Sequence, residues 1–271
     1  MSHFTVLVIG DGIKRQLAPF QENNMGDCPK EFLKFSAYPK EGERQFFDSE
    51  EEAKTVLGEN FDPEDSFWVN PNAKWDWFQI GGRWTGIFKL KPDTVGTLGK
   101  PGLMTPVVPN GFADSALKKD IDFEGMRTAA GDAAAKLWDK VNALIGDLLP
   151  TFISWDKMRN EIHEGNIDAA RKAYHAQEAV VKLSVAEDKD LRWCNPSDFN
   201  YTREVYVQRA KDAAVETFAV LKDGKWYERG HMGWWGCVSN EKDEDKWNHE
   251  FSALLDSLSD DTLLTIVDCH I

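Results

Sequence analysis

The chain has 271 residues, of which 42% are hydrophobic and 29% charged, and its formal net charge is -14. A chain of this length buries roughly 70% of its unfolded surface, so we expect a core that needs no disulfide staples, and the composition excludes disordered and collagen-like chains. No dense group of Lys and Arg is present, which disfavours duplex nucleic acid as a ligand, and no apolar run approaches the roughly 20 residues that cross a bilayer.

The first half of the chain alternates short elements with turns. The run FTVLVI predicts a buried strand over 4–9 that ends at a Gly-Asp-Gly turn, and no basic signal-peptide segment precedes it. A capping box formed by Ser49 and Glu52 predicts a short helix that stops at Gly58. We further expect irregular structure over 61–80, a strand over 83–91 and a long loop over 92–112.

The second half is mainly helical before it returns to strands. Apolar residues at steps of three and four predict a helix over 123–144, and Asn166 can cap a second helix that reaches Val181. An Asp-Gly pair at 223–224 predicts a tight hairpin turn. The remaining predicted elements are a helix over 202–214, a helix with one apolar stripe over 247–258 and a strand over 263–267.

This order of elements predicts an α+β fold. Because apolar strands at the two chain ends often lie side by side, we expect the N- and C-terminal strands to pair in a mostly antiparallel sheet. The helical stretch over 113–214 is expected as an insertion within a single domain that spans 1–271. If the terminal strands pair antiparallel, His3 lies close to His270.

Tryptophan is unusually frequent, with 11 in the chain, and eight of them surround the segments KWDWFQIGGRW and KWYERGHMGWWG. Tryptophan stacks on planar rings, paired glycines let the backbone approach a ligand, and arginine binds carboxylate or phosphate. These segments predict a pocket for a nucleotide-like small ligand, with packing of sheet against helices as the alternative. The predicted ligand-binding residues are Trp75, Trp77, Gly81, Gly82, Arg83, Trp84, Trp234 and Trp235.

Three polar residues are candidates for acid–base catalysis. They are Asp27 in the turn QENNMGDCP, His231 in GHMGWWG and His270 in the final DCHI. The alternative for the turn is a structural Asx turn. A histidine pair beside a carboxylate or thiolate can bind a metal or exchange protons, but no HExxH motif is present. The sequence leaves the metal, the cofactor and the oligomeric state undetermined.

The negative charge is concentrated in two segments. Residues 41–65 hold ten acids and two bases, and residues 240–261 hold eight acids and two bases. Such segments are typical of a solvated surface, and the alternative is a docking surface for a basic protein partner. The four cysteines show no CxxC pair and no zinc-site spacing, so we expect reduced, mostly buried thiols and a cytoplasmic protein.

Several strings resemble a family of uncharacterised proteins from tailed phages and prophage-bearing bacteria. They are MSHFTVLVIG, QENNMGDCP, KWDWFQIGGRW, KDGKWYERGHMGWWG and DDTLLTIVDCHI, so the resemblance covers both ends of the chain. It implies a phage-related setting in the cytosol of a bacterial host, and it carries no function.

Three functions remain open at this point. The first is a binding protein that stacks a planar, nucleotide-like ligand between tryptophans and pairs its anion with Arg83, which in a phage setting would sequester a host signalling nucleotide. The second is a hydrolase or transferase that uses the three acid–base candidates on a similar ligand. The third is an acidic interaction protein that inhibits a host factor.

Overall fold

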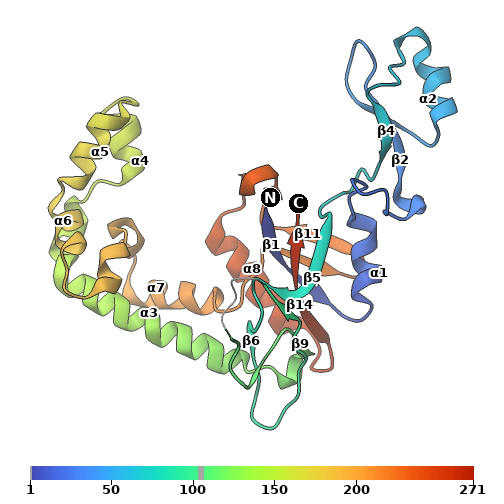
Figure 1. Ribbon diagram of the computed structural model, residues 1–271. Coiled ribbons are helices and arrows are strands. Elements are labelled where there is room, and N and C mark those ends of the chain that lie inside the picture. The colour runs from blue at the N-terminus through green and yellow to red at the C-terminus, as the bar shows by residue number, and fades with distance from the viewer. Residues whose placement is uncertain (1, 103–106) are drawn as a thin grey trace. The chain divides into compact units, whose positions relative to one another are not determined.

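The computed structural model describes residues 2–102 and 107–271, without the side chain of Trp234. The chain divides into two compact units (Figure 1), one formed by the residues up to Phe123 with Val215–Ile271 and the other by Glu124–Ala214. The helical unit therefore begins later than the predicted boundary at residue 113. The reason is that residues 112–117 carry two short strands, which belong to the first unit.

The principal sheet lies in the first unit, and its seven strands in the described chain follow the order β11-β10-β1-β14-β5-β7, with β9 also paired to β14. All neighbours are antiparallel except the pairs β1–β10 and β5–β7. The predicted α+β fold with a mostly antiparallel sheet is confirmed. The strands are β1 (His3–Ile9), β5 (Trp77–Gly82), β7 (Lys100–Pro101), β9 (Ser115–Leu117), β10 (Ala219–Lys222), β11 (Lys225–Glu228) and β14 (Leu263–His270).

The terminal strands β1 and β14 are neighbours at the centre of this sheet. Their antiparallel register runs from His3 opposite His270 to Ile9 opposite Leu264, as the sequence predicts. Phe4 and the five residues after it are all buried, because both faces of the strand are covered. On one face, Phe4, Val6 and Val8 pack in a core cluster that also contains Trp75 and Leu17.

Two further predictions near the C-terminus are confirmed. The hairpin between β10 and β11 turns through Asp223 and Gly224, whose φ angles of 51° and 71° are those of a primed two-residue turn. The last helix is α8 (Glu244–Ser257), and its apolar stripe includes the buried Trp247 and Phe251.

A second, smaller sheet follows the order β3-β2-β4 and packs against helix α2. Its elements are β2 (Lys34–Ala37), β3 (Gln45–Phe47), α2 (Glu50–Leu57) and β4 (Ser66–Val69). The predicted cap is present, since Ser49 Oγ accepts the amide of Glu52 at 3.1 Å. The carboxylate of Glu52 reaches one residue further back than predicted and accepts the amide of Asp48 at 2.8 Å.

The prediction for residues 61–91 is wrong in its placement of the strand. The segment expected to be irregular contains β4 and β5, and the expected strand over 83–91 is reduced to β6 (Phe88–Lys89). Strand β5 ends where Gly81 and Gly82 adopt positive φ, and the following residues turn, with the amide of Trp84 donating to the carbonyl of Gly81 at 3.1 Å. The other short elements of the first unit are α1 (Ile13–Leu17), β8 (Phe112–Ala113), β12 (His231–Met232) and β13 (Val238–Ser239).

The second unit is built on the predicted long helix, α3 (Phe123–Ile145). The helix expected to run from Asn166 to Val181 is broken at Gln177, whose side-chain amide exchanges two hydrogen bonds with the backbone of Ile153 at 2.8 and 2.9 Å. The remaining helices are α4 (Trp155–Lys157), α5 (Ile167–His175), α6 (Glu178–Ser184) and α7 (Arg203–Asp212). Within the described residues, no helix has the length and apolar character needed to cross a membrane.

Candidate functional site

One end of the principal sheet gathers polar and aromatic side chains from three strands. The pairing places His3 opposite His270, and His270 opposite Trp77. The first residue of β1, the last of β14 and the first of β5 therefore share one rung. The predicted proximity of His3 and His270 is confirmed.

Each of these histidines is held by a carboxylate. His3 Nδ1 lies 2.8 Å from Asp268 Oδ1, and His270 Nδ1 lies 2.6 Å from Asp76 Oδ1. The two imidazole rings meet edge to face, with centroids 5.0 Å apart. We call these four residues the paired-histidine site. A carboxylate at Nδ1 fixes the ring orientation and favours the tautomer whose Nε2 carries a lone pair.

Both Nε2 atoms are available to a ligand. No group of the described chain forms a hydrogen bond with Nε2 of His3 or of His270. The two side chains keep 16% and 13% of their surface exposed, whereas Asp268 is fully buried. The site therefore offers a ligand two oriented Nε2 atoms. The carboxylates that hold the two rings are poorly accessible to solvent.

The paired glycines make room for two buried carboxylates, one of which is Asp268 of the site. Asp268 also accepts the backbone amide of Arg83 at 3.0 Å, and a side chain at Gly82 would collide with the Asp268 carboxylate. Likewise, a side chain at Gly81 would collide with the carboxylate of Asp114. The prediction that Gly81 and Gly82 make room for a ligand is wrong, because two buried protein carboxylates occupy that space.

Asp114 has a structural role beside the site. Its carboxylate is fully buried and accepts the amides of Gly86 and Gly99, at 2.5 and 2.7 Å. Burial raises the pKa of Asp114, and the two backbone hydrogen bonds oppose that rise. Asp114 thereby ties together the loops that follow β5.

The predicted tryptophans divide between core and surface. Trp75 is buried, and its indole N–H donates to the carbonyl of Leu17 at 3.1 Å, so it offers no free face and its prediction as a stacking residue is wrong. Trp84 is half-buried and Arg83 is exposed. Trp77 is 49% exposed, and its ring lies edge-on to that of His3 at a centroid distance of 6.3 Å.

The second tryptophan segment reaches the same end of the sheet. Ser2, next to His3, donates to the carbonyl of Gly233 at 3.3 Å and accepts the amide of Gly236 at 2.5 Å. Between these glycines, Trp235 is 81% exposed and has a φ of 63°, a conformation that bulky residues rarely adopt. The side chain of Trp234 lies outside the described residues, so its predicted role stays a prediction.

No hydrogen bond or ion pair in the described chain joins the three predicted catalytic residues to one another. His231 belongs to a separate cluster, 3.4 Å from Lys74 Nζ and 3.8 Å from Glu228 Oε1. Asp27 is exposed in its turn, and no hydrogen bond or ion pair in the described chain joins it to His231 or His270. The expected set of three therefore stays a prediction. The sequence analysis pointed to a carboxylate beside the histidine pair through the final Asp268-Cys269-His270, but it did not identify Asp76.

No preformed metal site is present in the part of the chain that the structure describes. No group of three or more His, Cys, Asp or Glu is arranged there to hold an ion. The four cysteines are free thiols, and Cys28 and Cys269 are buried. Cys269 lies in the core cluster of the sheet, on the opposite face from its neighbour His270.

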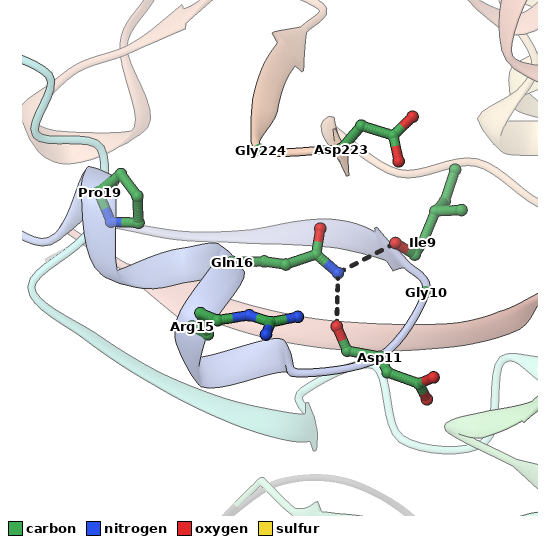
Figure 2. A pocket seen from close by; sticks show the side chains of 8 residues that line it. All are labelled: Ile9, Gly10, Asp11, Arg15, Gln16, Pro19, Asp223 and Gly224. Carbon is green, nitrogen blue, oxygen red and sulfur yellow. Dashed lines mark hydrogen bonds between the residues drawn. The ribbon is translucent and has the colours of Figure 1, made fainter.

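A cavity of about 500 Å³ lies at the other end of β1, about 20 Å along the strand from His3. Figure 2 shows its lining: Ile9, Gly10, Asp11, Arg15, Gln16, Pro19, Asp223 and Gly224. The amide of Gln16 donates to the carbonyls of Ile9 and Asp11 at 3.1 and 2.9 Å. No tryptophan lines this cavity, so it is not the aromatic pocket that the sequence predicts.

Comparison with known proteins identifies no relative. No protein-family model matches the chain, and no curated protein or solved structure matches it either. The geometry of the paired-histidine site is therefore the basis for a functional proposal.

Proposed function

We propose that the paired-histidine site performs general acid–base catalysis on a small, planar, nucleotide-like ligand, as a hydrolase or transferase. The observation that supports this proposal is the pair of carboxylate-held imidazoles whose centroids lie 5.0 Å apart. Two such rings can act together on one ester, one as the base and the other as the acid. Each carboxylate stabilises the imidazolium that forms when its ring takes up a proton.

Hydrolysis uses one water molecule and both histidines. Nε2 of one histidine removes a proton from a water molecule while the water oxygen forms a bond to the electrophilic centre of the ester. The other histidine enters the reaction as the imidazolium, and its Nε2–H donates a proton to the leaving oxygen as the ester bond breaks. The products are an acid and an alcohol, and solvent exchange returns each ring to its starting protonation state. In a transferase, an acceptor hydroxyl replaces the water.

The surrounding aromatics favour a planar group in the ligand. Trp77 is half-exposed beside His3, and Trp235 is exposed on the loop that contacts Ser2. Stacking on an indole contributes roughly 1–3 kcal/mol for each base. The exposed Arg83 follows β5 and can pair with an anionic group. The proposal thus keeps the predicted ligand class and assigns its recognition to Trp77, Trp235 and Arg83.

A second candidate is binding without turnover, in which the protein sequesters a signalling nucleotide in a phage-infected host. The exposure of Trp77 and Trp235 favours this candidate as much as it favours the first. Only the chemical fate of the ligand separates the two, because both use the same residues.

The test is incubation of the protein with linear, cyclic and dinucleotide phosphates, followed by mass spectrometry of the small molecules. We expect one of these classes to be converted, and His3→Gln or His270→Gln to slow the conversion about 100-fold or more. His175→Gln, in the helical unit, is the matched control and should leave the rate unchanged. Binding without product supports sequestration, whereas neither binding nor product contradicts both candidates.

A further inference from the structure

The small sheet β3-β2-β4 has one face that α2 does not cover. Phe46 and Phe67 both lie opposite Ser36 in the strand pairing, one on each side, so the two rings share a face of the sheet. The opposite face carries Phe35 and Phe47, which pack against α2. Tyr38 follows β2 on the uncovered side, two residues after Ser36.

The uncovered face is aromatic and exposed. Tyr38, Phe46 and Phe67 keep 42%, 46% and 50% of their surface accessible. Singly exposed apolar residues are ordinary, but three aromatic rings gathered on one sheet face are typical of a surface that binds something. We call Tyr38, Arg44, Phe46 and Phe67 the aromatic face.

Arg44 shows what chemistry this face accepts. Its guanidinium carbon lies 5.1 Å from the ring centre of Phe46, 5.4 Å from that of Tyr38 and 5.6 Å from that of Phe67. Its Nε donates to Ser36 Oγ at 2.5 Å, and no carboxylate of the described chain pairs with it. Three rings therefore already hold one guanidinium by cation–π contact, in a stretch that is otherwise acidic.

Carboxylates border the aromatic face. Glu41, Glu43, Glu64 and Asp65 are exposed, and none of them forms an ion pair with a described residue. They lie in the two segments that lead into β3 and β4, which are joined where the amide of Tyr38 donates to the carbonyl of Asp65 at 3.4 Å. Unpaired carboxylates beside aromatic rings repel a nucleic-acid backbone and attract cations.

We propose that the aromatic face docks an arginine-rich segment of a partner protein. The guanidinium groups of such a segment would stack on Phe46 and Phe67 while their N–H donors pair with the bordering carboxylates. Arginine suits this surface better than lysine, because its planar guanidinium stacks on a ring and still donates hydrogen bonds at its edge. This inference is independent of the paired-histidine site.

Two labelled peptides test the proposal by fluorescence anisotropy. One is an octamer that alternates arginine with glycine, and the other replaces each arginine by lysine. We expect the arginine peptide to bind at least threefold more tightly than the lysine peptide, and its affinity to fall when salt rises from low to physiological concentration. An eight-nucleotide single-stranded RNA is the third probe and should not bind.

Two double variants test whether the peptide binds at the aromatic face. Phe46→Ala with Phe67→Ala should weaken arginine-peptide binding tenfold or more, and Phe67→Ala alone is the reserve variant if the double change unfolds the sheet. Glu43→Gln with Asp65→Asn should weaken it severalfold. The control is Glu51→Gln with Glu59→Gln, which removes the same charge from α2 and from the turn that follows it.

Weaker binding in the first two variants with unchanged binding in the control supports docking at the aromatic face. The proposal is overturned if the control double variant loses as much binding as the other two double variants. It is also overturned if the two peptides bind equally, if the RNA binds preferentially, or if no peptide binds at low salt.

Discussion

His270 Nδ1 lies 2.6 Å from a carboxylate oxygen of Asp76, although 194 positions separate the two residues in the chain. Asp76 directly follows Trp75, whose indole is fixed in the core by its hydrogen bond to Leu17. The backbone amide of Asp76 also donates to the carbonyl of His270 at 2.9 Å. The core anchor at Trp75 and the strand pairing together fix the carboxylate beside the ring.

This relationship predicts the tautomer of His270. With Asp76 as acceptor, the neutral ring carries its proton on Nδ1, and long-range ¹⁵N NMR should show this. Asp76→Asn replaces the charged acceptor and should increase the population of the other tautomer at His270, while His3, which is held by Asp268, stays unchanged. A His270 spectrum that does not respond to Asp76→Asn would contradict the assigned pair.

Gly82→Ala should lower the free energy of unfolding by more than the conformational penalty that alanine pays at a positive φ. Gly82 has a φ of 60°, and an added Cβ would collide with the carboxylate of Asp268. The matched control is Gly111→Ala, where φ is 83° and no atom lies within 4 Å of the new Cβ. We expect the control to lose about 1 kcal/mol in free energy of unfolding and Gly82→Ala to lose at least twice that. Equal losses, measured by urea denaturation, would refute the tight packing of Asp268.

Stability at alkaline pH should depend on Cys269. Burial raises the pKa of this thiol well above its ordinary value, with the charges of Asp268 and Asp76 adding to the rise. The folded-state pKa lies above the unfolded one, so above roughly pH 8.5 the unfolded chain loses a proton that the folded chain keeps. This thiol therefore lowers the free energy of unfolding as pH rises, by about 1.4 kcal/mol for each pH unit.

Cys269→Ala removes that dependence. The variant should be less stable than the wild type at pH 7, because the lost sulfur leaves a small cavity, and the difference should shrink between pH 8.5 and pH 10. Cys237→Ala at an exposed thiol is the control and should follow the wild-type curve. Parallel curves for the wild type and Cys269→Ala would show that the thiol titrates alike in both states.

Trp235→Gly should separate stability from binding. Glycine adopts the positive φ of Trp235 without strain, and the indole is 81% exposed, so the free energy of unfolding should stay the same or rise by up to about 1 kcal/mol. If Trp235 stacks on the ligand, the same change should weaken nucleotide binding about tenfold, measured by isothermal calorimetry. Unchanged affinity would remove Trp235 from the proposed site.

The sequence predicted the part of this site that depends on strand pairing and missed the part that depends on tertiary packing. Continuous apolar strands at both chain ends leave few alternatives to the pairing of β1 with β14, and that pairing brings His3 to His270. Asp76 was not identified because its position depends on β5, which has a mixed polar pattern and was placed as irregular structure. The roles of Trp75 and Gly82 were misassigned because residue type alone does not show whether a ring, or the space above a glycine, faces protein or ligand.

A ¹⁵N NMR titration of the histidine side chains with the nucleotide panel tests directly whether His3 and His270 form one acid–base site. We expect one ligand class to shift Nε2 of His3 and Nε2 of His270 at the same concentrations, while His175 and His249 stay unchanged. Shifts at only one of the two paired histidines, or at neither while nucleotide binds elsewhere, would contradict a shared acid–base site.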